Sequence, residues 1–268
     1  MRALFALDEL GLEFEFILAS ATMGPDGSTF KGNAPFGIVD TPGYRAMNPN
    51  GTVPTLDDDG FIVWESNTLL RYLAMKYGPD ALYGGDIETL ASASSWMDWD
   101  SAHMMAPQHV LVMHCARLPE PDRDPAALDV ACRSIDELLA VLDRRLTNTR
   151  FLAGDRFTMG DIPAAIHKRR WDVFARDGTC YAILERWYAE VAARSSLLEV
   201  FDRQDCVECD AGLLEGGCRP FPAVDQREHQ HDLRPRLANG LHGLERRTAR
   251  RRHVFQDHNA LAGKRLAW

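Results

Sequence analysis

The sequence contains no long uninterrupted apolar segment. Its longest apolar runs, such as FIVW at 61–64 and VLVM at 110–113, fall far short of the roughly 20 residues that a helix needs to span a bilayer. The first residues, MRALFALDELGLEFEF, carry acidic side chains where a secretory signal peptide would be apolar. We therefore expect no membrane partner and a cytoplasmic location.

Cysteine is scarce and irregularly spaced. The 6 cysteines among 268 residues do not make a disulfide framework, and in the cytoplasm they would be reduced. Cys206 and Cys209 have the spacing of half a zinc site, but Cys218, His229 and His231 do not provide a matching second pair. The sequence therefore predicts no metal site.

Basic residues are outnumbered, and the charge is unevenly spread. Residues 1–204 hold 19 Lys and Arg against 30 Asp and Glu, whereas residues 205–268 hold 11 against 9. The acidic first part argues against nucleic acid as a partner, because binding to phosphates needs a basic face. The basic run RRTARRR at 246–252 is interpreted as a solvated tail, since no aromatic residue is interleaved.

Short periodic segments fill the N-terminal part of the chain. The expected elements are, in order, a helix over 2–10, strands at 13–18, 53–56 and 61–64, and a helix over 65–77. Residues 19–43 are rich in Gly, Pro and Ser and are expected to form a long loop. Together these elements predict one compact α/β unit over residues 1–78.

The next part of the chain has only helical patterns. Four helices are expected, at about 86–117, 123–147, 158–175 and 180–194. They predict a separate all-helical domain over residues 86–204. Residues 205–268 show no sustained period and many Gly, Pro and charged residues, so we expect a mostly disordered tail.

The segment FTMGDI at 157–162 is typical of a helix start. Thr158 can accept a hydrogen bond from the backbone N–H of Asp161, while the Asp161 carboxylate can accept one from the N–H of Thr158. Phe157 can pack on Ile162 as a hydrophobic staple. We therefore interpret Thr158 and Asp161 as a structural capping box rather than as catalytic residues.

The stretch NPNGTVPTLDDDGFIVWESNTLLRYLAMKYG, residues 48–78, carries the chemistry. A helix that begins near Ser66 exposes unpaired N–H groups, which favour an anion, and Ser66 adds a hydroxyl there. Glu65 adds a carboxylate, which suits an ammonium group. A neighbouring anion site and cation site match the head of an α-amino acid. The residues alone slightly favour a structural role, a hairpin followed by a capped helix, over a binding site.

Taken with RALFALDELGLEFE before it and FLAGDRFTMGDI after it, this stretch resembles the cytosolic glutathione S-transferases of the bacterial type. The resemblance covers about residues 1–204. It implies an α/β thioredoxin-like N-terminal domain, an all-α C-terminal helical domain, and a homodimer that conjugates glutathione to small electrophiles. It also implies that Glu65 and Ser66 hold the γ-glutamyl end of glutathione. Val53, which precedes a cis-proline at Pro54, would pair through its backbone with the cysteinyl part.

The chain departs from the family pattern at its start. The family fold opens with a strand and then a Ser, Tyr or Cys that interacts with the glutathione sulfur, whereas here Met1 stands at the start of the first expected helix. We therefore expect a sheet that lacks its first strand, and we assign no catalytic residue. Either Met1 is internal to a longer protein or the chain is naturally truncated.

Two other functions remain open on the same scaffold. One is a glutathione-dependent reductase, isomerase or dehalogenase, which the residue at the missing catalytic position would distinguish. The other is a noncatalytic module that binds glutathione or a protein partner.

Overall fold

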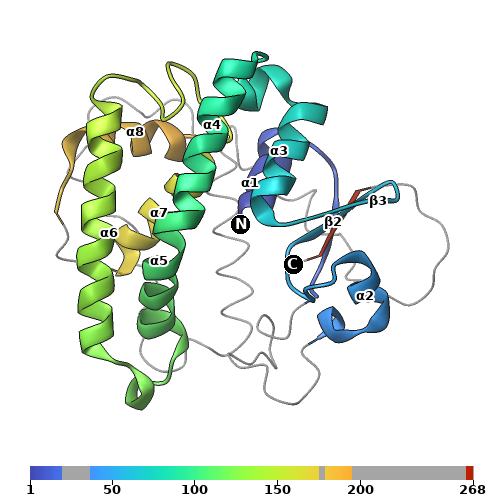
Figure 1. Cartoon of the computed structure of the whole chain (residues 1–268), viewed down its shortest axis with the longest axis horizontal. Helices are drawn as coiled ribbons and strands as arrows, with labels where there is room; N and C mark the ends of the chain where they lie inside the picture. Colours follow the sequence, from blue (N-terminus) through green and yellow to red (C-terminus); the bar gives the residue numbers. More distant parts are fainter. Residues whose placement is uncertain (20–36, 175–178, 195–263, 268) are drawn as a thin grey trace, which may run out of the picture.

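The computed structural model describes residues 1–19, 37–174, 179–194 and 264–267. The N-terminal elements are α1 (Arg2–Glu9), β1 (Glu15–Ile17), a 3-10 turn (Ile38–Asp40), α2 (Pro42–Met47), β2 (Thr55–Asp58), β3 (Phe61–Trp64) and α3 (Ser66–Tyr77). The helical part contains α4 (Ile87–Trp99), α5 (Met105–Val112), α6 (Pro125–Leu146), α7 (Asp161–Phe174) and α8 (Ala182–Ala192). A last strand, β4, covers Lys264–Ala267. The α/β unit and the helical unit expected from the sequence are both present and lie side by side (Figure 1).

The helices of the α/β unit form because their apolar residues recur on one face. Phe5 and Leu7 of α1, and Leu69, Leu70 and Leu73 of α3, are fully buried. The two helices pack against each other beside the sheet. The helix α3 begins at Ser66, with Glu65 alone between it and the end of β3, and stops at Gly78.

The sheet has four strands in the order β1-β4-β2-β3. The hairpin of β2 and β3 was expected, and its turn uses Gly60 at a φ of 90°. The strand β4 lies between β1 and β2, parallel to the first and antiparallel to the second. The expectation of a disordered tail is therefore wrong for residues 264–267, and the expected gap in the sheet is filled. Residues 205–263 lie outside the described part of the chain.

The long helical segment after the linker alternates between two helix types. Between α4 and α5 the chain forms a π-helical turn over Asp100–Met104, and a second one, Met113–Arg117, follows α5. Pro107 has no N–H, and its ring crowds the carbonyl four residues earlier. The regular α-helical hydrogen bonds from each N–H to the fourth carbonyl before it are therefore interrupted at the first of these turns. Such single π-turns are frequent at functional sites.

The helical unit is held together around Asp161, which is fully buried. Its carboxylate accepts hydrogen bonds from the backbone N–H of Thr158 (2.9 Å) and of Leu152 (2.9 Å), and from the indole Nε1 of Trp187 (2.9 Å). Half of the predicted capping box is therefore present. The other half is wrong, because the Thr158 hydroxyl donates to Asp161 (3.2 Å) and accepts from Gly160 N–H (3.3 Å) instead of Asp161 N–H.

Replacing Asp161 by Ala is expected to lower the free energy of unfolding by at least about 3 kcal/mol. Four donors, the N–H groups of Thr158, Leu152 and Trp187 and the Thr158 hydroxyl, would lose their acceptor, and each buried unsatisfied group costs roughly 1–3 kcal/mol. The matched control is Asp86→Ala, which removes an exposed helix cap that accepts from Thr89 N–H (2.8 Å); it should cost about 0.5–2 kcal/mol. Urea denaturation followed by circular dichroism measures both. Equal losses in the two variants would contradict this account of Asp161.

Candidate functional site

The start of α3 is an uncapped helix terminus. The first bond of the helical ladder is donated by Leu69 N–H to the carbonyl of Glu65 (2.9 Å), and no side chain caps the helix. The backbone N–H groups of Ser66, Asn67 and Thr68 therefore have no acceptor within the helix. Three such donors at the positive end of a helix dipole form a site for a carboxylate or phosphate.

Glu65 stands directly before this terminus in an unusual backbone conformation. Its φ is 69° and its ψ is 118°, a region that residues other than glycine rarely adopt. Strain of this kind costs about 1–3 kcal/mol and concentrates at functional sites. The Glu65 side chain is exposed, and its carboxylate has no ion-pair partner in the described part of the chain. The strained backbone thus holds the exposed Glu65 carboxylate beside the anion site.

The second half of the site is the corner formed by Val53 and Pro54. The peptide bond between them is cis, as the family resemblance implied. Val53 is half-buried, and in the segments that the structure describes its backbone N–H and C=O have no hydrogen-bond partner. Because Thr55 pairs with Trp64 across the hairpin, this corner and Glu65 lie at the same end of the sheet. The structure therefore brings together the four site residues predicted from the sequence.

The loop before this corner is fixed by two buried side chains. Tyr44 donates from its hydroxyl to the carbonyl of Thr52 (2.8 Å), and Asn48 donates from Nδ2 to the same carbonyl (2.9 Å). Both also contact the Thr55 hydroxyl, Tyr44 at 2.8 Å and Asn48 at 3.1 Å. These bonds fix the backbone on both sides of Val53.

Behind Ser66 lies a group of buried polar side chains from three distant parts of the chain. Arg2 of α1 donates to Asn67 Oδ1 (2.9 Å), lies 3.5 Å from Ser66 Oγ and forms an ion pair with Asp100. The ring of His167 in α7 completes the group, with its Nε2 3.3 Å from Arg2 Nη2 and 3.3 Å from Asp100 Oδ1. We call Arg2, Asp100 and His167 the buried triad. It joins the first turn of α3 to the helical unit.

Burial and neighbouring charges set the ionisation of the triad. Burial alone would raise the pKa of Asp100, but its neighbours His167 and Arg2 outweigh burial, so this pKa is lowered. Burial, together with the charges of Arg170 and Arg2, lowers the pKa of His167 despite the nearby Asp100. The triad is therefore best described as an Arg2–Asp100 ion pair beside a neutral imidazole.

An exposed apolar side chain lies next to the same group. Met105, at the first position of α5, is 43% exposed, and its sulfur lies 3.2 Å from Arg2 Nη2. On the preceding turns Trp96 and Trp99 form an edge-to-face pair with ring centres 5.5 Å apart. Met104, in contrast, is fully buried and belongs to the core. Of these side chains, Met105 is the one that lies beside the start of α3, through its contact with Arg2.

Sequence reasoning did not find the buried triad or the pair of Tyr44 and Asn48. Arg2, Asp100 and His167 are polar residues inside helical patterns, where they are expected to face solvent. The available signal was Asp100 and Gln108, polar residues amid the apolar turns of a long helix. Their common location depends on how the helices pack, which no local pattern records.

Other candidates do not extend the site. The cysteines and histidines weighed for zinc, residues 206–231, and the basic run at 246–252 lie outside the described residues. Within the described ranges no group of His, Cys, Asp and Glu side chains is placed to hold a metal ion. The helices in these ranges are also too short or too polar to cross a membrane.

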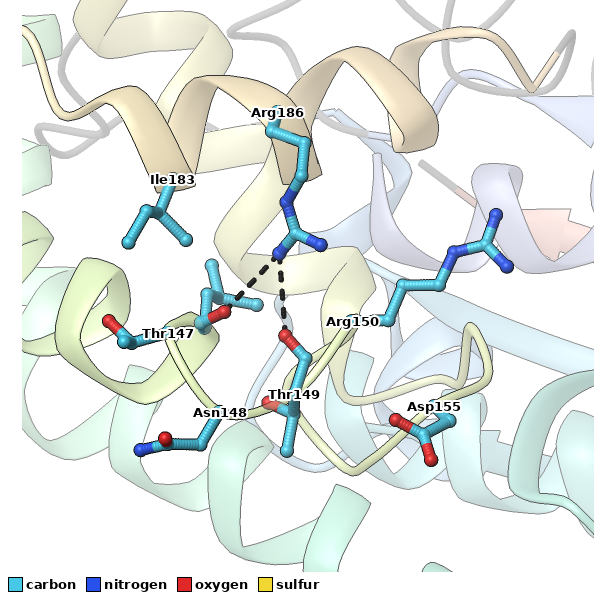
Figure 2. A pocket seen from close by; sticks show the side chains of 8 residues that line it. Thr147, Asn148, Thr149, Arg150, Asp155, Ile183 and Arg186 are labelled. Atoms are coloured by element: carbon cyan, nitrogen blue, oxygen red, sulfur yellow. Dashed lines mark hydrogen bonds between the residues drawn. The ribbon is translucent and has the colours of Figure 1, made fainter.

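A surface hollow lies elsewhere, between the end of α6 and the start of α8 (Figure 2). Figure 2 shows Arg186 reaching the loop after α6, where its Nη2 donates to the carbonyls of Leu146 (3.3 Å) and Thr149 (3.3 Å). Arg150 at the rim is paired with Glu190 (2.7 Å). Both arginines are thus engaged in holding the fold, and the hollow does not border the Val53–Glu65 corner.

The fold and the site define a class, an α/β unit with a cis-proline corner joined to an all-helical unit. The family models for the N-terminal and C-terminal domains of glutathione S-transferase match residues 1–76 and 101–194. This chain belongs to the glutathione S-transferase family.

Individual relatives agree with this assignment. The chain is 35% identical over 201 residues to glutathione S-transferase GstB of Escherichia coli (strain K12), covering 74% of this chain and 90% of that one. It is 29% identical to glutathione S-transferase 4 of Zea mays over 60% of this chain and 67% of the relative. A solved theta-class glutathione S-transferase from Xanthomonas axonopodis pv. citri, with glutathione bound, is 35% identical. Its TM-score is 0.63, over 74% of this chain and 89% of that one.

The buried triad predicts that acid destabilises the protein. Below about pH 6.5 the unfolded chain protonates His167 while the folded chain, with its lowered pKa, does not, so the free energy of unfolding falls as the pH drops. Asp100 adds a further loss below about pH 4, because its pKa is also lowered on folding. Urea denaturation at a series of pH values measures the curve.

The variant His167→Gln should flatten the part of this curve that begins below about pH 6.5. The matched control is His103→Gln, since His103 is exposed; its curve should follow that of the wild type. Parallel curves for the wild type and His167→Gln would contradict the assignment of a neutral buried imidazole.

Proposed function

We propose that the chain binds glutathione and joins its sulfur to small electrophiles. The observation that carries this proposal is the uncapped start of α3, with the exposed Glu65 carboxylate before it and, beside it, a Val53 backbone that no described residue pairs with. An anion site, a cation site and an extended peptide edge at one place match the charges and backbone of glutathione. The relatives named above, one of them with glutathione bound, support the same choice.

Each part of glutathione has a matching group. The α-carboxylate of the γ-glutamyl end would accept from the Ser66 hydroxyl and from the first N–H groups of α3. Its ammonium group would pair with Glu65. The cysteinyl peptide would exchange hydrogen bonds with the N–H and C=O of Val53.

The second substrate would lie on the side of the helical unit. Met105 is exposed there and reaches the side chain of Arg2, which in turn lies near Ser66. An apolar electrophile bound against Met105 would lie on the side of the site where Ser66 holds glutathione, and holding two reactants next to each other is itself a large part of catalysis. In the reaction the thiol gives up its proton, the thiolate sulfur bonds to carbon, and the leaving group departs with the displaced electron pair. We assign no residue to the activation of the thiol.

The homodimer stays a prediction of the family resemblance, and the cytoplasmic location stays a prediction from the sequence composition. Sedimentation velocity over a range of protein concentrations tests the dimer. A single species with the mass of one chain at micromolar concentration would contradict it.

Replacing Glu65 or Ser66 by Ala should weaken glutathione binding by roughly 1–3 kcal/mol, the cost of losing a hydrogen bond to a charged group. The control is Thr68→Ala, since Thr68 is exposed and contributes its backbone N–H, which the substitution keeps. Isothermal titration calorimetry of each full-length variant measures the affinity. Wild-type affinity in both Glu65→Ala and Ser66→Ala would reject this placement.

A second measurement separates conjugation from binding alone. Turnover of a chromogenic aryl halide with glutathione is expected in the wild type and should fall with the affinity in both variants. Glutathione binding without any turnover would overturn the transferase proposal and support the alternative of a noncatalytic glutathione-binding module.

A further inference from the structure

The strand β4 is an internal strand of the sheet although it comes from the far end of the chain (Figure 1). On one side Glu15, Phe16 and Ile17 of β1 pair with Arg265, Leu266 and Ala267. On the other side β4 pairs along the whole of β2, Thr55–Asp58. In the described ranges β1 has no other strand partner. Without β4 only the hairpin of β2 and β3 would remain, and a two-stranded hairpin is marginally stable by itself.

The register of β4 directs its end toward the site. Lys264 lies opposite Asp58, and Ala267 lies opposite Thr55, the first residue of β2. Thr55 is separated from Val53 by Pro54 alone. The end of β4 is therefore level with the corner that carries the unpaired Val53 backbone.

Thr55 is the point where the supports of this corner meet. Its backbone is paired with Ala267 on one side and with Trp64, next to Glu65, on the other. Its hydroxyl contacts the two side chains that hold the preceding loop, Tyr44 and Asn48. Removing β4 would release one of the two strands that fix Thr55, and with it the position of Val53 relative to Glu65.

We propose that the space between β1 and β2 is a strand-binding groove for residues 264–267 of this chain, and that glutathione binds tightly only when that strand is docked. The proposal rests on the glutathione site proposed above. The groove offers N–H and C=O groups from a parallel neighbour and an antiparallel neighbour, which is the recognition mode of an added β-strand. Because coupling between two binding events is reciprocal, glutathione must also tighten the docking of β4.

The test in the full-length chain is Leu266→Pro, which removes a backbone N–H from an internal strand, where proline is not tolerated. Its control is Leu266→Val, which keeps the N–H and suits a strand. Glutathione affinity should fall by at least about tenfold, or roughly 1.4 kcal/mol, in the proline variant and stay near the wild-type value in the control. Equal affinity in all three proteins would overturn the proposal.

A peptide rescue separates loss of the strand from general misfolding. The peptide AGKRLAW, residues 262–268, is added in excess to Leu266→Pro, and a scrambled peptide serves as control. Restored glutathione binding with AGKRLAW alone supports the groove. No rescue in a variant whose helical circular dichroism equals that of the wild type would overturn it.

Hydrogen exchange on the wild type needs no variant. The amides of residues 265–267 should exchange more slowly than those of the free peptide, and saturating glutathione should slow them further. Exchange at the rate of the free peptide, or protection that glutathione leaves unchanged, would overturn the proposal. If the wild type binds no glutathione at all, the proposed function fails first, and slow exchange at 265–267 shows that the groove is nevertheless occupied.

Discussion

The ion pair between Arg2 and Asp100 is the interaction on which the arrangement of the two units depends. It joins the first residue of α1 to the π-turn between α4 and α5, and both side chains are almost completely buried. A buried charge left without its partner costs several kcal/mol, so each residue requires the other. The remaining donor capacity of Arg2 reaches Asn67 and approaches Ser66. The same interaction therefore packs the units together and sets the start of α3.

The candidate site is built from backbone more than from side chains. The strained conformation at Glu65 turns the chain from β3 into α3 so that the helix begins with N–H groups that the helix itself does not bond. Among the described residues the adjacent Val53 backbone is also unpaired. Strain persists only where the surroundings determine it. Here the hairpin pairing on one side and the Arg2 contact on the other hold the conformation. The conformational entropy needed to order the site is thus lost when the protein folds, so that ligand binding does not have to supply it.

The parts of the fold that depend on local sequence could be predicted. The hairpin at DDDG, the helices and the contact from Asp161 to Thr158 N–H each follow from residues that are neighbours in the chain. The four candidate site residues, Val53, Pro54, Glu65 and Ser66, could be proposed because they lie within one short stretch that the family resemblance covers.

The parts that depend on distant residues could not be predicted. The strand β4 has four residues and no flanking pattern, and its position follows only from the edges that β1 and β2 present. The buried triad joins residues 2, 100 and 167, whose sequence neighbourhoods give no sign that they meet. The Thr158 hydroxyl donates a hydrogen bond to Asp161 instead of accepting one from its N–H. This difference from the prediction depends on the burial of Asp161 beside Trp187.

The most direct test of the central claim is a crystal structure of the full chain grown with glutathione. The account predicts the γ-glutamyl carboxylate within hydrogen-bond distance of Ser66 Oγ and of an N–H in the first turn of α3. It also predicts the ammonium group beside Glu65 and the cysteinyl backbone paired with Val53. Glutathione bound at another surface while this corner carries none would contradict it.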